Sequence, residues 1–257
     1  MENAFPDHDR ELVRRRAASF GGSAAAYAAE RPGYPAAAVR WALEGAPGPR
    51  VLDLGAGTGK LTGELLRGGA GPGDVVAVEP DPEMLAELRR RVPGVRAEAG
   101  GAEAIPLPDG SADAVLVGQA LHWFDLDRAL PEIHRVLAPG GVLAALWNLD
   151  DDRVPWVAGF KEQARSSVSW TGWSGNDLPP SRWFPGVERA EFPNAQRRTA
   201  ASLTATAATH SHILVLDDAE RAAVLDRIRA YLRSVPETAE GEFDLPIVTL
   251  ALRTTRA

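Results

Sequence analysis

The chain contains no cysteine, and this absence excludes several kinds of chemistry at once. Without a thiol there is no disulfide framework, no thiolate nucleophile and no cysteine-based zinc site. Long hydrophobic runs are also absent, so we expect no membrane span, and the first residues lack the apolar stretch of a signal peptide. The simplest expectation is a cytoplasmic protein that does not act at a membrane.

Positive charge is scarce as well. The chain has 28 lysines and arginines against 35 acidic residues, which gives a net charge of −7. Its two basic triplets, Arg14–Arg16 and Arg89–Arg91, are better explained as solvated helix faces than as binding patches. Because nucleic-acid binding depends on neutralising phosphates, we expect no nucleic-acid partner. The sequence also shows no metal-ligating constellation.

A glycine-rich turn follows the first apolar segment of the chain. Residues 50–54 are predicted to form a buried strand, and three glycines follow at alternate positions, Gly55, Gly57 and Gly59. A helix is expected from about Thr58 to residue 67. Glycines let the backbone turn tightly and approach a ligand closely, and a strand, a turn and a helix N-terminus together make a nucleotide-type binding site.

Two other glycine motifs can be tested on the same residues, and both fail. A dinucleotide fingerprint, G-x-G-x-x-G, needs a third glycine where Lys60 stands. A phosphate-binding P-loop needs a glycine in place of Leu54 and a serine or threonine in place of Leu61.

The pattern Asp53-x-Gly55-x-Gly57-x-Gly59 resembles the first motif of the class I methyltransferases that use S-adenosylmethionine (SAM). The resemblance implies SAM as cofactor and S-adenosylhomocysteine (SAH) as product, with Gly55, Ala56 and Gly57 beside the methionine part. The next expected strand ends at Glu79, where a carboxylate can accept hydrogen bonds from both ribose hydroxyls, as in dinucleotide folds. The alternative for Glu79 is a charge that caps a helix.

Strands and helices alternate regularly from Pro49 to Trp147, which predicts an α/β fold. We expect a Rossmann-like, doubly wound sheet of seven strands, mostly parallel, with an antiparallel final strand. A helix is expected from Asp81 to about residue 92, with Asp81 as its cap. The other helices are expected at about 11–20, 24–30, 35–44, 125–137 and 216–235, and the strands at 50–54, 74–79, 95–99, 112–118, 142–147, 187–192 and 245–252.

Three regions are expected in chain order. Residues 1–45 would form an N-terminal helical lid, residues 46–150 the SAM-binding core, and residues 151–257 would complete the sheet and add an aromatic-rich insertion. The spacing of Phe20, Tyr27, Arg31 and Tyr34 resembles the N-terminal segment of methyltransferases related to trans-aconitate methyltransferase. That resemblance implies that Tyr27 and Arg31 face the cofactor and places Tyr34 toward the substrate. The alternative is ordinary packing with a surface salt bridge.

Further cofactor contacts are implied by the same resemblance. The turn after the second strand, with Pro80 and Met84, would line the adenine. The stretch after the third strand resembles the family pattern small-acidic-x-L-P-x-x-D-x-S-F-D, in which Ala102 offers a backbone group to the adenine edge and Glu103 lies close by. This chain departs from the pattern at Ala112, where an aromatic residue is usual.

The segment after the fourth strand should lie beside the transferable methyl group. Gln119 is expected to contact the cofactor, and His122 is a candidate general base because the ordinary histidine pKa is about 6.5. Alternatively, His122 holds the loop by hydrogen bonds. Trp123, Trp147 and Trp173 are candidate walls for an apolar or aromatic acceptor, or else they anchor the segments that carry them.

These features predict an enzyme that transfers a methyl group from SAM to an oxygen, nitrogen or carbon atom of a small molecule, as a monomer or homodimer. The alternative from another class is a SAM- or SAH-binding protein of the same fold that transfers nothing, such as a cyclase or a regulatory binder.

Overall fold

A computed structural model describes residues 31–167 and 177–257. It divides into two compact units that do not follow the chain order. Of the described residues, a sheet unit holds 32–149, 177–194 and 247–257, and a helical unit holds Arg31, 150–167 and 195–246. The expected regions at 1–45, 46–150 and 151–257 therefore stay a prediction, and most of the expected lid lies outside the described residues.

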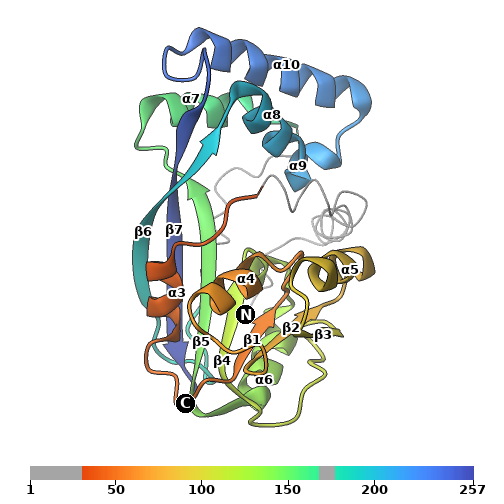
Figure 1. Cartoon of the computed structure of the whole chain (residues 1–257), viewed down its shortest axis with the longest axis vertical. Coiled ribbons are helices and arrows are strands. Elements are labelled where there is room, and N and C mark those ends of the chain that lie inside the picture. Colours follow the sequence, from red (N-terminus) through yellow and green to blue (C-terminus); the bar gives the residue numbers. More distant parts are fainter. Residues whose placement is uncertain (1–30, 168–176) are drawn as a thin grey trace. The chain divides into compact units, whose positions relative to one another are not determined.

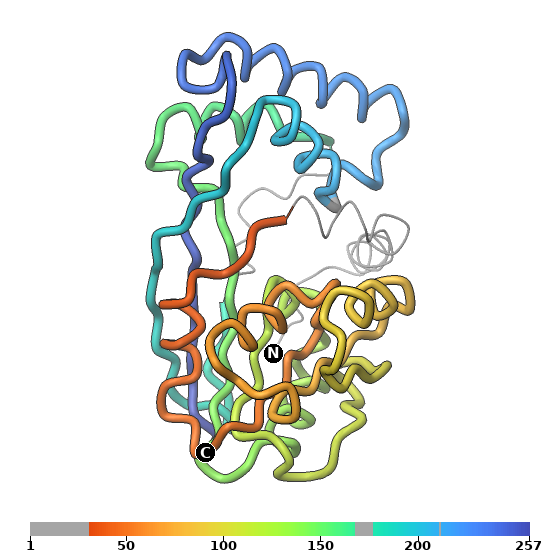
Figure 2. Tube along the Cα trace, viewed as in Figure 1, coloured from red at the N-terminus to blue at the C-terminus, as the bar shows by residue number. Residues whose placement is uncertain are grey.

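The strands form one sheet of seven in the order β3-β2-β1-β4-β5-β7-β6 (Figure 1). The strands from β1 to β5 pair in parallel. The last three strands lie side by side (Figure 2), with β7 antiparallel to its neighbours. The predicted fold class is confirmed. The strands are β1 (Val51–Leu54), β2 (Val75–Glu79), β3 (Arg96–Ala99), β4 (Ala112–Gly118), β5 (Leu137–Asp150), β6 (Glu188–Arg198) and β7 (Phe243–Thr255).

Helices cover both faces of the sheet unit. Successive side chains of a strand point to opposite faces, so a strand between two layers of helices is buried on both sides. On β5, Leu143, Ala145 and Trp147 pack with helix α6, while Ala144 and Leu146 pack with α3 and α4. This two-sided burial explains the continuously apolar central strands. The helices of this unit are α3 (Ala36–Leu43), α4 (Lys60–Arg67), α5 (Pro82–Arg91) and α6 (Leu126–Val136), with a short 3₁₀ turn, η2 (Leu121–Trp123).

The predicted boundaries hold best where a single residue sets them. Asp81 caps α5 by accepting hydrogen bonds from the backbone N–H groups of Glu83 and Met84, both at 2.9 Å. Helix α4 starts two residues later than expected, because Gly59 has a left-handed φ of 81° and cannot belong to the helix. Strand β5 is longer than the expected 142–147, and its pairing register with β4 shifts between Ala112 and Ala114.

The helical unit contains α10, which matches the helix expected at 216–235, and three helices that the sequence did not reveal, α7, α8 and α9. On α7, Trp156 and Phe160 are buried, and the Trp156 ring meets the Phe243 ring edge-on at 5.6 Å. The Tyr231 hydroxyl of α10 donates to the Trp156 carbonyl at 3.0 Å. Among the described residues, no helix is long and apolar enough to cross a membrane. The helices of this unit are α7 (Pro155–Gln163), α8 (Ala200–Ala208), α9 (Ser211–Leu214) and α10 (Asp218–Ser234).

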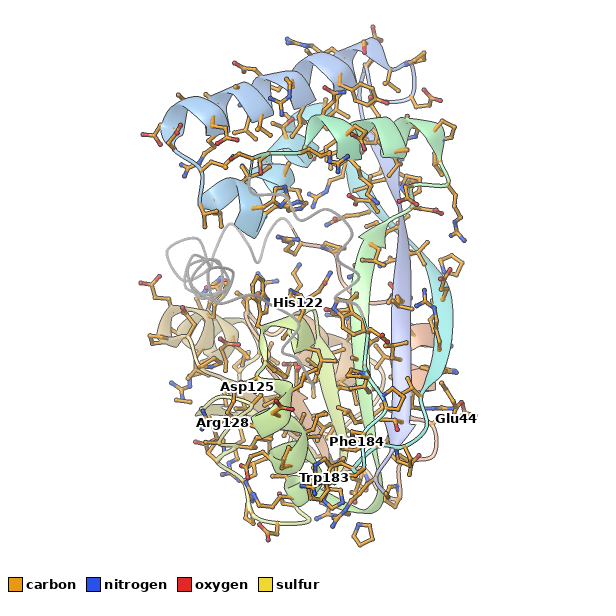
Figure 3. The ribbon with its side chains drawn as sticks, turned by 180° about the vertical axis from the view of Figure 1, so that it is seen from behind. Glu44, His122, Asp125, Arg128, Trp183 and Phe184 are labelled. Carbon is orange, nitrogen blue, oxygen red and sulfur yellow. The ribbon has the colours of Figure 1, made fainter. Side chains whose placement is uncertain are left out.

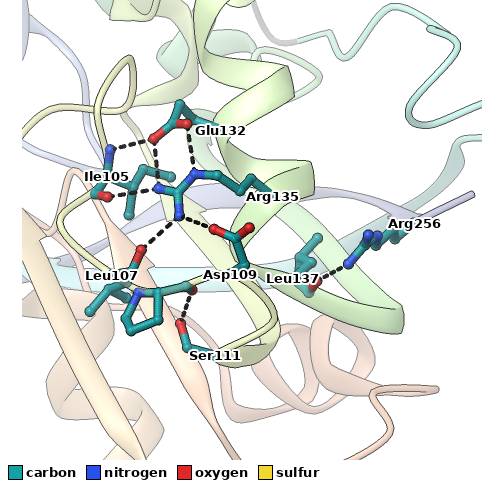
Figure 4. Close-up of polar contacts among 9 residues, drawn as sticks. Ile105, Leu107, Asp109, Ser111, Glu132, Arg135, Leu137 and Arg256 are labelled. Atoms are coloured by element: carbon teal, nitrogen blue, oxygen red, sulfur yellow. Dashed lines mark hydrogen bonds and ion pairs between the residues drawn. The ribbon is translucent and has the colours of Figure 1, made fainter.

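Arg135 of α6 fastens the loop between β3 and β4 (Figure 4). Its guanidinium donates to the carbonyls of Ile105 and Leu107 at 2.9 and 2.8 Å and pairs with the Asp109 carboxylate at 2.8 Å. Glu132 on the same helix pairs with Arg135 and also accepts from the Ile105 N–H at 2.9 Å. The hydrogen bonds from Arg135 to Glu132 and Asp109 raise the pKa of the guanidinium.

We expect Arg135→Ala to destabilise the protein by about 1–3 kcal/mol, because two carbonyls and two carboxylates lose their charged donor. Urea unfolding followed by circular dichroism measures this loss. Arg128→Ala is the matched control, since Arg128 lies on the same helix and is exposed. Equal stability of the two variants would show that the cluster contributes nothing.

Candidate active site

The backbone after β1 turns on three left-handed glycines. Gly55, Gly57 and Gly59 have φ values of 69°, 56° and 81°. A Cβ atom on Gly55 would lie 2.7 Å from the Cβ of Ala120, so this position has no room for a side chain. A Cβ on Gly57 would meet no atom within 4 Å. The turn is thus closed toward the protein at Gly55 and open at Gly57, where a ligand can approach the backbone.

Glu79 at the end of β2 holds this turn in place. One carboxylate oxygen accepts from the Gly57 N–H at 2.8 Å, and the other accepts from the Asp81 N–H at 2.9 Å. The residue is 7 % exposed, and burial raises its pKa while the two backbone hydrogen bonds oppose that shift. Each oxygen keeps a second lone pair, so the carboxylate can still accept from hydroxyl groups of a ligand.

Asp53 lies buried in β1, directly before the turn, with 1 % of its surface exposed. Its Oδ2 accepts from the Thr62 hydroxyl at 2.5 Å, whereas its Oδ1 has no hydrogen-bond partner among the described residues. Burial raises the pKa of Asp53 to about 7, against the hydrogen bonds from Thr62. A buried carboxylate oxygen without a partner is costly, and a cationic or N–H group of a ligand would satisfy it.

Beyond β4 the backbone is strained at Gln119. Its φ of 58° makes Gln119 the one non-glycine residue with positive φ in the described part of the chain. The backbone N–H of Gln119 donates to the Leu146 carbonyl at 2.8 Å, and its side-chain amide donates to the Asn148 carbonyl at 3.0 Å. Such strain persists only where surrounding contacts fix the residue, and it is often found at functional sites.

His122 follows within η2 and meets two tryptophans. The indole N–H of Trp147 donates to His122 Nδ1 at 3.3 Å, and the ring of Trp123 lies 4.5 Å from the imidazole at 50°. Trp147 is 1 % exposed, whereas His122 and Trp123 are half-buried. The sheet register explains the first contact, because Gly118 of β4 pairs with Leu146 of β5.

A polar network at the end of β5 holds the segment that precedes α3. The side-chain amides of Asn148 and Asn194 both donate to the Gly33 carbonyl at 3.1 Å. The Thr249 hydroxyl donates to Asn148 Oδ1 at 2.6 Å. Next to Gly33, the Tyr34 hydroxyl lies 2.6 Å from where a Cβ on Gly118 would be, so this packing requires glycine at 118.

Comparison with known proteins identifies the family. A methyltransferase domain family matches residues 52–145, which include the glycine turn and His122. An uncharacterized methyltransferase of Mycobacterium tuberculosis is 42% identical over 247 residues, 93% of this chain and 96% of the relative. The chain belongs to the class I methyltransferases. An uncharacterized methyltransferase-like protein of Schizosaccharomyces pombe is 35% identical over 228 residues, covering 85% of the methyltransferase described here and 87% of the relative.

A solved structure agrees with this assignment. A protein of Anaeromyxobacter dehalogenans described as a type II methyltransferase shares 28% identity with a TM-score of 0.62, covering 88% of this methyltransferase and 96% of that chain. The family uses SAM as methyl donor, and the residues of this methyltransferase fit that cofactor. Gly57 leaves open space at the turn, and Glu79 keeps lone pairs that ribose hydroxyls can fill. Asp53 Oδ1, which has no partner among residues 31–167 and 177–257, could accept from an amine.

The other predicted cofactor residues of the methyltransferase remain predictions, and the structure places them as follows. Ala56, Met84 and Ala102 are buried, and Pro80 is exposed. Glu103 accepts from the Asp125 N–H at 2.9 Å. The guanidinium of Arg31 donates to the Thr209 carbonyl at 3.1 Å within the helical unit. Tyr27 lies outside the described residues.

One tryptophan of the methyltransferase, Trp183, packs against the core of the sheet unit. Trp183 lies against His134, with ring centroids 4.6 Å apart, and Arg256 donates both to His134 Nε2 and to the carbonyl of Leu137 at the amino end of β5. Figure 3 shows Trp183 and Phe184 far from His122 within the sheet unit. Trp183 therefore anchors the core, and Trp173 lies outside the described residues. Trp147 and Tyr34 are buried, so little of either side chain is exposed for the predicted contact with a substrate.

Sequence reasoning missed the network of Asn148, Asn194 and Thr249 and the strained Gln119 backbone of the methyltransferase. The network joins residues up to 161 positions apart, which no local pattern reveals. One feature of the sequence could have indicated the positive φ of Gln119, since a turn directly after a buried strand often needs an unusual backbone conformation.

We expect Asp53→Asn to flatten the pH dependence of stability. The folded pKa of about 7 lies above the unfolded value of about 3.9, so the folded state binds the proton more tightly. The stability associated with protonated Asp53 is fully present below about pH 4 and is lost as pH rises through about 7. Urea unfolding at about pH 5 and pH 8 measures the difference. An equal pH dependence in both proteins contradicts this assignment.

We expect Glu79→Ala to weaken SAH binding, with a cost of about 1.5–3 kcal/mol for each charge-assisted hydrogen bond lost. Calorimetry with SAH and with its 2′,3′-dideoxyribose analogue separates the expected contact of Glu79 with the ribose hydroxyls from its contact with the Gly57 N–H. If Glu79 binds the ribose hydroxyls, the mutation costs less affinity for the analogue than for SAH. The same loss for both ligands would assign Glu79 to the Gly57 turn alone.

Proposed function

We propose that this chain transfers the methyl group of SAM to a small-molecule acceptor and releases SAH. The single observation that supports this most is the turn at Gly57, where an added Cβ would meet no atom within 4 Å and whose N–H donates to the buried Glu79 carboxylate. SAM, when bound, supplies a methyl group that its sulfonium already activates. The chain itself has to bind, align and exclude water, and alignment alone accounts for a large share of such a rate.

The residues after β4 are proposed to act on the acceptor. Gln119 is held in a strained conformation by two hydrogen bonds from its backbone and side chain, so the start of η2 has a fixed direction. His122 and Trp123 follow directly and are half-buried, which leaves part of each side chain accessible. A small acceptor is supported by the chain's negative charge, which disfavours nucleic acid. We propose action in the cytoplasm as a monomer or homodimer.

We expect Gly57→Ala to lower SAH affinity at least tenfold, because its added Cβ would occupy the space that the ligand needs. Gly94→Ala is a close control, since Gly94 also has positive φ and no atom within 4 Å of an added Cβ. Both variants carry a similar backbone cost of about 1–2 kcal/mol. Calorimetry and thermal unfolding together separate the loss of binding from the loss of stability.

Transfer itself is tested with SAM labelled in its methyl group and a panel of small carboxylates, alcohols, phenols and amines. Label in any of these acceptors supports the proposal. SAH binding without label in any acceptor favours the alternative, a binder of the same fold that transfers nothing. Absence of SAH binding contradicts the proposal outright.

A further inference from the structure

We propose that Asn148 is a positioning residue of the methyl-transfer site, which holds the residue after β4 and the segment before α3 in one arrangement. This inference rests on the proposed function and adds to it a residue that acts through others. It is carried by a closed path of contacts within the sheet unit, which we call the contact ring. The ring runs from Asn148 through Gly33, Tyr34, Gly118 and Gln119 and back to Asn148.

The side chain of Asn148 holds the segment that precedes α3. Its amide N–H donates to the Gly33 carbonyl at 3.1 Å, and the amide of Asn194 in β6 donates to the same carbonyl at 3.1 Å. The Asn148 Oδ1 accepts from the buried Thr249 hydroxyl at 2.6 Å. In the flipped amide, Oδ1 would face the Gly33 carbonyl and two acceptors would meet, so the orientation of the Asn148 side chain is determined.

A fixed Gly33 places the ring of the next residue on the end of β4. The hydroxyl of Tyr34 lies 2.6 Å and its Cζ lies 3.0 Å from the position that a Cβ on Gly118 would occupy. Gly118 is the last residue of β4, and Tyr34 is 7 % exposed. Leu61 of α4 lies 3.2 Å from the same position, so the phenol ring packs at this strand end together with α4.

Gln119 follows Gly118 directly and closes the contact ring. Its backbone N–H donates to the Leu146 carbonyl at 2.8 Å, and its side-chain Nε2 donates to the Asn148 carbonyl at 3.0 Å. A carbonyl can only accept, so this bond fixes the Nε2 end of the amide toward β5 and leaves Oε1 as the end that can accept from a ligand. The left-handed φ of 58° is unfavourable for a residue with a Cβ, so it persists only while these contacts hold it.

The contact ring joins the two segments that the proposed function uses. Gln119 starts the segment that carries His122 and Trp123, and transfer depends on how well such groups are aligned with the methyl group. Asn148 reaches this segment through its backbone and reaches Gly33 through its side chain. Thr249, by contrast, makes no hydrogen bond to Gly33 or Gln119 in the described part of the chain, although it belongs to the same network.

Two substitutions of nearly unchanged shape separate positioning from stability. In Asn148→Asp, the carboxylate still accepts from the Thr249 hydroxyl but has no N–H for the Gly33 carbonyl. Thr249→Val is the matched control, because it removes one hydrogen bond of the same network and leaves both donors to Gly33 in place. We expect both variants to unfold at lower urea concentration than the unmodified protein, since each leaves a buried polar group without its partner.

The first experiment measures transfer kinetics with methyl-labelled SAM and the best acceptor of the panel. We expect Asn148→Asp to lower kcat about 10- to 100-fold, because a small misplacement of aligned groups is enough for such a loss. We expect KM for SAM in this variant, and kcat in Thr249→Val, to change by less than about threefold. Equal losses of kcat in the two variants, or a loss confined to KM for SAM, overturn the positioning role.

The second experiment needs no acceptor. Urea unfolding of Gln119→Leu, Asn148→Asp and the double variant forms a thermodynamic cycle, which measures whether the two side chains act on each other. If the contact ring joins them, the unfolding constants should depart from additivity by at least about fivefold, whereas additivity within about twofold overturns the ring. The same cycle with Thr249→Val in place of Asn148→Asp should be additive, and an equal departure there overturns the assignment to Asn148.

A second variant keeps the test decisive if Asn148→Asp does not fold. Asn194→Asp removes the other donor to Gly33 and leaves the Asn148 side chain unchanged. It should show the same loss of kcat and the same departure from additivity with Gln119→Leu, and additivity there also overturns the ring. Calorimetry with SAH is run on the unmodified protein: failure of SAH to bind refutes the proposed function, whereas the unfolding cycle decides on the contact ring by itself.

Discussion

The hydrogen bond between the Gly57 N–H and the Glu79 carboxylate is the contact on which the site depends. It joins the carboxyl ends of β1 and β2, two strands that already pair in parallel. The glycine turn can follow this path only because its residues tolerate left-handed φ, and the same turn sets where α4 begins. A carboxylate at the end of β2 therefore determines the shape of the cofactor turn before it contacts any ligand.

The fold could be predicted from the sequence wherever one residue or one regular period decides the structure. Alternating apolar strands and helices predicted the parallel sheet, Asp81 marked the start of α5, and the helix expected at 216–235 matches α10 (Asp218–Ser234). The region after residue 150 was predictable only in part, because its helices pack around aromatic residues without a clear helical period. Trp156, for example, is buried by Phe243, which lies far along the chain.

The candidate site shows the same division. Glycines, Glu79 and His122 stand in a recognisable motif or at a strand end, so sequence could place them. What the side chains bind depends on contacts across the sheet, such as Asn148 with Thr249 or Trp147 with His122. Trp183 is a further example, because its packing against His134 of α6 and the core is a contact that no local pattern reveals.

The charged groups of the site determine which kind of ligand it favours. Two buried carboxylates, Asp53 and Glu79, lie at the cofactor turn, and burial raises the pKa of both. A cation bound there would be attracted by the two carboxylates. It would also lower their pKa values and so keep them ionised. After β4, the rings of Trp123 and Trp147 contact His122. Attack of an anion on a sulfonium merges opposite charges into neutral products. Charge that disappears during the reaction is solvated less in the transition state than in the reactants, so surroundings poor in water favour it.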